Sequence, residues 1–160
     1  MTDKDVMIRQ LEQAFDKRSW HGPNLMGSIR GLSEEQAGWR PGEGRHNIWE
    51  VVVHAAYWKY AVLRKLTNNP RGQFSLKGSN WFARRPDDGS LSFKNDVGRL
   101  RDYHSQLLSA VRAHPASALD KIAPGKKDTY RDIIIGVAAH DLYHAGQIQL
   151  LKRLQQTAPD

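Results

Sequence analysis

The sequence predicts an all-α protein, specifically a four-helix bundle. Four stretches repeat apolar residues at the three- and four-residue spacing of a helix that packs one face against a core. No stretch shows the alternation of apolar and polar residues that is typical of a half-buried strand. Long helices without strands bury their apolar faces against one another, and four of them form a bundle.

The first helix is expected over residues 3–19, where apolar residues recur among charged ones. A short helical extension follows it. The extension begins at Pro23, whose fixed φ suits the first position of a helix, and runs through Leu32. Proline and glycine residues after Ala37 then predict a turn and a loop.

The second helix is expected from Asn47 to Leu66 and is apolar over more than half of its circumference. Asn47 suits the N-cap position, and Glu50 stands three residues later, where it completes a capping box. We therefore expect this helix to be well buried. Residues 67–91 are rich in proline and glycine and predict a long loop, and a loop of this length in a compact domain is usually functional or mobile.

The third helix is expected over residues 93–114, because Pro115 stops it. Residues 118–128 predict a further loop, and residues 129–155 predict the fourth helix. We expect residues 1–160 to form a single domain, which is large enough to bury a core without disulfides.

The composition excludes several classes of protein. The chain has no cysteine, which excludes disulfide frameworks, thiolate-zinc sites and cysteine nucleophiles and favours the cytoplasm. No apolar run is long enough to cross a bilayer, so no membrane partner is expected. The net charge of +7 permits contact with nucleic acid, but the basic residues are spread along the chain without a nucleic-acid-binding motif. A solvated basic surface is the preferred interpretation.

Two histidines stand four residues apart in the fourth predicted helix. His140 and His144 are one helical turn apart, so their side chains lie over the same patch of helix surface. The positions expected to face the core are Ile134, Ile135, Ala138, Leu142, Ala145, Ile148 and Leu151. Two histidines at this spacing form half of a metal site, although each would also serve as a hydrogen-bonded core residue.

A firmly held metal needs a third protein ligand, and His54 is the candidate. It lies in the middle of the apolar second helix, where an unpaired imidazole would lose its hydrogen bonds to water. A ligand role explains this position, and a hydrogen bond to a neighbouring helix would also explain it. Asp141 follows His140 but projects about 100° away around the helix, so we expect it outside the ligand set.

The segments VVVHAAYWKY and HDLYHAGQI and the order of the helices resemble the DinB-like superfamily, which includes YfiT-like proteins and bacillithiol transferases. The resemblance covers most of the chain. Its most specific part is a histidine in the second long helix and the H-x-x-x-H of the last helix, which match His54, His140 and His144. It implies an up-down-down-up bundle, with residues 67–91 as the crossover between the second and third helices. It also implies one divalent metal ion per chain, usually zinc or nickel, held by the three histidines.

The resemblance further implies a metal-dependent transferase that adds a low-molecular-weight thiol to an electrophilic small molecule, in stress response or detoxification. Members of the family are often homodimers. The reactive group would be a thiolate or a water on the metal, because three neutral imidazoles leave the metal its charge and open coordination positions. Two alternatives stay open. One is a hydrolase that uses metal-bound hydroxide, and the other is a stress-induced bundle that binds metal or nucleic acid without catalysis.

Two polar residues near the predicted ligands have a functional and a structural interpretation. Glu50 precedes His54 by four residues, and Gln147 follows His144 by three. Either side chain would orient a ligand or a bound water, or would instead serve in capping and packing.

The other histidines and the tryptophans are less suggestive. His21 and His46 lie at loop ends, where they would line a pocket mouth or cap a helix, and His104 is expected on a packed or half-exposed face. His114 lies at a helix C-terminus, which favours positive charge. The tryptophans expected in the core are Trp39, Trp49, Trp58 and Trp81.

Overall fold

The computed structural model describes residues 1–125 and 127–157 and confirms the all-α class. The four long helices are α1 (Asp3–Phe15), α4 (Ile48–Leu66), α5 (Phe93–Ala113) and α6 (Tyr130–Thr157). Two short helices, α2 (Leu25–Ile29) and α3 (Glu34–Gly38), lie between α1 and α4, and a 3-10 turn, η1 (Ala116–Ala118), follows α5. Lys126 in the predicted loop 118–128 and the last three residues of the predicted domain lie outside the described residues.

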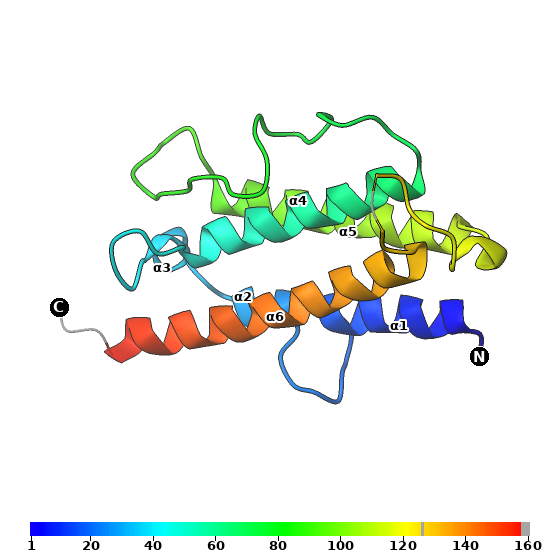
Figure 1. The fold of residues 1–160 in the computed structure, drawn as a ribbon. Helices are drawn as coiled ribbons and strands as arrows, with labels where there is room; N and C mark the ends of the chain where they lie inside the picture. Colours follow the sequence, from blue (N-terminus) through cyan, green and yellow to red (C-terminus); the bar gives the residue numbers. More distant parts are fainter. Residues whose placement is uncertain (126, 158–160) are drawn as a thin grey trace.

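The long helices lie along one another in two pairs (Figure 1). Helices α4 and α5 run in the same direction, and α1 and α6 run in the opposite direction. Residues 67–92 connect the end of α4 to the start of α5 and return along the outside of this pair. None of the helices in the described part of the chain is both long and apolar enough to pass through a membrane.

The predicted start of α4 is confirmed, whereas the ends of the N-terminal helices differ from expectation. Asn47 and Glu50 form the capping box: the Asn47 side chain accepts from the Glu50 N–H, and the Glu50 carboxylate accepts from the Asn47 N–H. Helix α1 ends at Phe15 rather than residue 19, because the N–H groups of residues 16 and 17 both turn back to the Glu12 carbonyl. The extension expected from Pro23 starts instead after an Asn24 N-cap and forms the two short helices α2 and α3.

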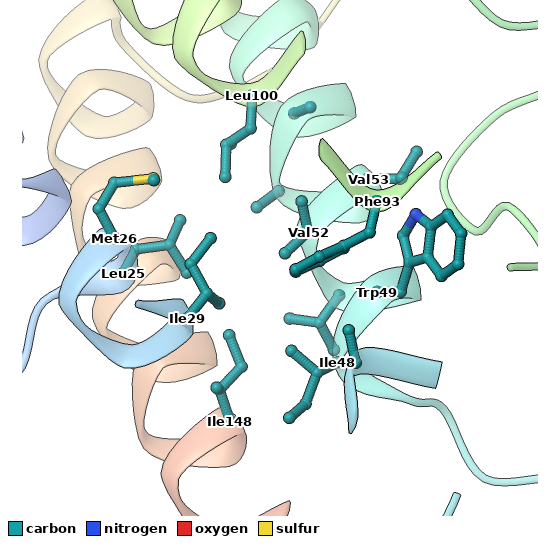
Figure 2. Packing of buried hydrophobic residues seen from close by; sticks show 14 of the residues in the cluster. Leu25, Met26, Ile29, Ile48, Trp49, Val52, Val53, Phe93, Leu100 and Ile148 are labelled. Atoms are coloured by element: carbon teal, nitrogen blue, oxygen red, sulfur yellow. The ribbon is translucent and has the colours of Figure 1, made fainter. Parts of the chain in front are cut away.

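The core consists of two apolar clusters, one at each end of the molecule. The larger cluster joins α2, α4, α5 and α6, and Figure 2 shows part of it: Leu25, Met26 and Ile29 of α2 and Ile148 of α6 face Ile48 and Val52 of α4. The second cluster joins α1, α5 and α6 around Leu11, Leu107 and Ile134. Burial of these apolar faces supplies the main driving force for folding.

A polar layer lies between the two apolar clusters. Lys59 of α4, His104 of α5 and Asp141 of α6 are all buried there, each at a position between residues of the two clusters. Phe15 closes the layer on the α1 side: its ring stacks on His104 with centroids 3.6 Å apart, and the Lys59 ammonium lies 4.9 Å from its centroid. This layer is at the level of the histidines of α4 and α6.

Several side chains expected in the core are exposed. Ile135 and Leu142 reach solvent, whereas Ile134, Ala138, Ala145 and Ile148 are buried as predicted. The apolar residues of α6 extend around the helix beyond the face that the other helices cover, so periodicity alone did not locate the buried stripe. Among the tryptophans, Trp49 is fully buried, but Trp58 is 40% exposed.

Candidate metal centre

The structure brings His54, His140 and His144 together, as the sequence predicted. His54 projects from the middle of α4, and the other two project from one face of α6. The His140 Nε2 atom lies 3.2 Å from the His54 Nε2 and 3.0 Å from the His144 Nε2. One nitrogen of each ring therefore points to a common centre, which is the arrangement that a metal ion requires.

The second ring nitrogen of two of these histidines has a partner that fixes the ring. The His54 Nδ1–H donates to the Asn80 carbonyl at 2.9 Å, and the His144 Nδ1–H donates to the Gln147 Oε1 at 2.7 Å. Because a neutral imidazole carries one proton, both Nε2 atoms keep their lone pairs for the centre. The predicted role of Gln147 as an orienting residue agrees with this contact.

The donor set fits a divalent transition metal. Two nitrogens bound to one zinc ion at the usual 2.0–2.1 Å lie roughly 3.0–3.4 Å apart, depending on the coordination geometry. The two nitrogen separations found here, 3.0 and 3.2 Å, fall in that interval. Imidazole nitrogens bind both zinc and nickel and discriminate only weakly between them. The structure therefore supports a metal site but does not identify the metal.

Burial keeps the three imidazoles neutral, which is the form that binds metal. It lowers the pKa of His140 to about 3 and that of His144 to about 4, and in both cases the neighbouring histidines add to the effect. Burial also lowers the pKa of His54, against a smaller opposite effect of its bond to Asn80. At neutral pH no proton has to be displaced before these ligands bind.

An aromatic stack covers one ring of the centre. The Trp81 ring stacks on the His54 ring with centroids 3.8 Å apart and on the His46 ring with centroids 3.6 Å apart. The His46 Nδ1 lies 3.0 Å from a Glu50 carboxylate oxygen, and both oxygens of that carboxylate accept from Arg40. His46 is therefore near the centre but separated from it by an indole ring.

The hydrogen bonds of Glu50 show which parts of the protein it connects. Its hydrogen bonds go to Arg40, to His46 and to the backbone of residues 47 and 84. Through these bonds Glu50 joins the start of α4 to the loop before it and to the segment between α4 and α5. A direct orienting role toward His54 stays a prediction.

The segment between α4 and α5 contributes Asn80 and Trp81, two residues whose roles the sequence did not indicate. Asn80 has a positive φ of 64°, a conformation that asparagine tolerates better than most residues. Its carbonyl accepts from His54, and its side-chain oxygen accepts from the Trp58 indole at 3.0 Å. The only available signal was the Gly78-Ser79-Asn80 run, which predicts a turn.

A cavity of about 1090 Å³ opens beside the centre. Its walls come from the second half of α4, from residues 71–79 of the segment that follows it and from the first part of α6. His140 is part of its lining, so the cavity reaches the metal ligands. This volume is at the upper end of the range of small-molecule sites.

The remaining histidines and Asp141 lie outside the centre. Asp141 pairs with Lys59 in the polar layer, as the helical geometry led us to expect for a residue outside the ligand set. His104 is fully packed against Phe15, and His114 ends α5 beside the ring of Tyr130. His21 is exposed in the loop after α1.

The fold and the centre together define a helical protein with a three-histidine site that is able to bind a metal ion. The family model of the DinB superfamily matches residues 19–148, and the chain belongs to this superfamily, whose members often bind metal. The match covers all three histidines. No curated protein and no solved structure was found to match the chain.

Proposed function

We propose that this protein is a metal-dependent enzyme that transfers a low-molecular-weight thiol to an electrophilic small molecule. The observation that carries the proposal is the position of His140, which both joins the three-nitrogen centre and lines the 1090 Å³ cavity. A structural metal usually has four protein ligands and no substrate space beside it. Three ligands next to a cavity favour catalysis instead.

The proposed reaction forms a bond between the thiol sulfur and an electrophilic carbon. The leaving group departs with the electron pair of its bond to carbon, and the thiol proton passes to water. A divalent ion bound by three neutral imidazoles would supply positive charge that lowers the pKa of the thiol. Zinc and nickel are the metals that we propose for this role.

The protein's own residues prepare the site. The hydrogen bonds from His54 to Asn80 and from His144 to Gln147 fix the orientation of two ligand rings before metal binds. The indole of Trp81 covers one face of the His54 ring and limits the entry of water there. The cavity holds the second reactant close to His140.

We propose that the four long helices form the up-down-down-up bundle of the family, with residues 67–91 as its crossover, and that the protein is a homodimer. An exposed apolar strip on α6 supports a dimer: Ile135, Leu142, Tyr143 and Leu150 all reach solvent. Light scattering of the purified protein tests this proposal, and a Leu150→Glu variant should be a monomer. Nucleic acid is not among the proposed partners, because no basic tract or recognition motif is present.

The test uses protein purified without a histidine tag. The chelator-treated protein is incubated with a thiol and an aromatic chloride electrophile, with and without added zinc or nickel, and the conjugate is measured by absorbance. We expect metal to restore the reaction in the wild type and not in a His140→Ala variant. A His21→Gln variant is the matched control and should react like the wild type. Transfer that is unaffected by metal and by His140→Ala, or hydrolysis of esters without thiol, would overturn the proposal.

A further inference from the structure

Three of the cations that line the cavity beside the metal centre form no ion pair with an acidic side chain in the described part of the chain. Arg64 of α4 and Arg71 and Lys77 of the crossover all contribute to its wall. Within residues 1–125 and 127–157, no acidic side chain forms an ion pair with any of these three. Arginines elsewhere in the protein, such as Arg84 and Arg131, are paired with aspartates. Unpaired cations that share one concave wall attract an anion.

The acidic residues of the wall are fewer than these cations. Asp128 and Asp132 also line the cavity. The Asp132 carboxylate accepts from both the N–H and the hydroxyl of Thr129, at 2.9 and 2.7 Å, so it caps the start of α6. With both carboxylates counted, the three cations still outnumber the acidic groups, so the lining keeps an excess of positive charge.

Aromatic and apolar side chains form the rest of the wall. Tyr57, Trp58 and Phe74 line the cavity, and the Tyr57 and Phe74 rings pack edge to face with centroids 5.3 Å apart. Trp58 is 40% exposed although it stands on an otherwise buried helix, so part of its ring is free for a ligand. A flat apolar body would pack against these rings while a charged group reaches the arginines.

A glycine in α6 keeps the cavity open. Gly136 lines the cavity one helical turn before His140, and a Cβ atom added there would meet nothing within 4 Å. A helix with glycine in its interior is less stable than the same helix with alanine, so α6 is less stable with Gly136 than it would be with alanine. Side chains of a helix lean toward its N-terminus, and the bare backbone at Gly136 therefore leaves the space next to the His140 ring unfilled.

We infer that this cavity is a binding site for an organic anion, with an apolar or aromatic body between Tyr57, Trp58 and Phe74 and a carboxylate, sulfonate or phosphate group at Arg64 and Arg71. The assignment of the anion as one of the two reactants rests on the proposed function. The binding site itself does not, because the cations and the glycine define it without the metal. Either the thiol or the electrophile would carry the anionic group.

The first experiment compares two fluorescent probes with the same aromatic body. Anilinonaphthalene sulfonate is anionic, and N-phenylnaphthylamine is its neutral counterpart. We expect the sulfonate to bind the wild-type protein with one site per chain and about tenfold more tightly than the amine, the scale of one charge-assisted hydrogen bond. Added salt should weaken the binding of the sulfonate but not the binding of the neutral amine. Equal affinities for the two probes would overturn the inference.

Variants then locate the site. An Arg64→Gln, Arg71→Gln double variant should weaken sulfonate binding about tenfold and leave the neutral probe within about twofold. An Arg9→Gln, Arg18→Gln double variant is the control. Both arginines are exposed and lie outside the cavity, and their replacement removes the same net charge. Gly136→Phe should block both probes, whereas Gly146→Phe should not, because Gly146 lies on the same helix with equal space but outside the cavity. Sulfonate binding that survives both the arginine pair and Gly136→Phe would contradict the site.

A last comparison separates this inference from the proposed function. The sulfonate should bind to chelator-treated protein as well, and this result stands whether or not the protein transfers thiols. In zinc-loaded protein, 4-mercaptobenzoate and 4-methylbenzoate are compared as competitors of the probe. Stronger displacement by the mercapto compound would show that the thiol substrate carries the anion, and equal displacement would assign it to the electrophile. Failure of both to displace the probe would overturn the anion site.

Discussion

The Lys59 ammonium and the Asp141 carboxylate form an ion pair inside the core, with Nζ and Oδ2 2.5 Å apart and neither side chain exposed. Lys59 stands five residues after His54 on α4, and Asp141 directly follows His140 on α6. The pair therefore joins the two helices that carry the three histidines, next to the histidines themselves. A buried pair is poor evidence of net stability, but its geometry fixes one alignment of the helices.

Removal of one partner of this pair should be strongly destabilising. Lys59→Met leaves the Asp141 carboxylate buried without its counter-charge, which costs about 3–5 kcal/mol of unfolding free energy in comparable cases. Urea denaturation measures the loss. The double variant Lys59→Met, Asp141→Leu should recover most of it, because no uncompensated charge remains. A single variant as stable as the wild type would show that the pair does not form.

His104 should make the protein sensitive to acid. Burial is the main cause that lowers the pKa of its imidazole from the ordinary 6.5 to about 2, with Lys59 as a second cause. Between these two values the unfolded chain binds a proton that the folded protein does not bind, so stability falls as the pH falls below 6.5. For one group of this kind the loss between pH 7 and pH 5 is about 2 kcal/mol.

A His104→Phe variant tests this acid sensitivity. Neither His104 nitrogen has a hydrogen-bond partner, so phenylalanine removes no bond and keeps a ring against Phe15. Measured in chelator at pH 7 and pH 5, the variant should lose about 2 kcal/mol less than the wild type. The other histidines contribute equally to the pH dependence of stability in the variant and in the wild type. Identical pH dependence of the two proteins would mean that His104 is charged or solvated in the fold.

Gln147 should matter for metal affinity more than for stability. Its side-chain oxygen accepts from the His144 Nδ1–H, and loss of such a partner typically lowers metal affinity about 10–100-fold. We expect this loss in a Gln147→Leu variant, measured by competition with a chromogenic chelator. Gln149→Leu, two positions later on α6, is the control and should bind like the wild type. Equal affinities of both variants would remove Gln147 from the site.

The four histidines outside the centre should be dispensable for metal binding. His21, His46, His104 and His114 can each be replaced by Gln, and one ion per chain should still bind. His46 is the most demanding case, because it stacks on Trp81 close to the ligands. Metal content after gel filtration measures the outcome, and loss of the ion in any one of the four variants would show that the ligand set is wrong.

The sequence predicted the parts of the site that depend on local geometry. The spacing of His140 and His144 on a helix brings their rings together, and the buried position of His54 marked it as a third ligand. The capping box of Asn47 and Glu50 located the start of α4 correctly. The histidine pair of α6 and the capping box depend on contacts between residues three or four positions apart, which are the contacts that periodicity and capping rules describe. His54 was indicated instead by its polar side chain in an apolar helix.

The sequence did not predict the parts that depend on the crossover and on packing between helices. The contact of Asn80 with His54 joins residues that lie 26 positions apart, and the pair of Lys59 and Asp141 spans 82 positions. A lysine inside the apolar segment AAYWKYAV is the signal that would have indicated a buried partner. Asp141 could not be identified as this partner without knowing how α4 packs against α6.

The most direct test of the central claim is the metal content of protein purified without a tag and dialysed against zinc or nickel. We expect one ion per chain in the wild type and none in His54→Ala, with the helical circular dichroism unchanged because the apolar clusters hold the fold without metal. Chelation should lower the melting temperature of the wild type, since an ion at a hundredfold excess over its Kd stabilises the folded state by about 2.7 kcal/mol. Full metal occupancy in His54→Ala, with no effect of chelation on the melting temperature of the wild type, would contradict the three-histidine centre.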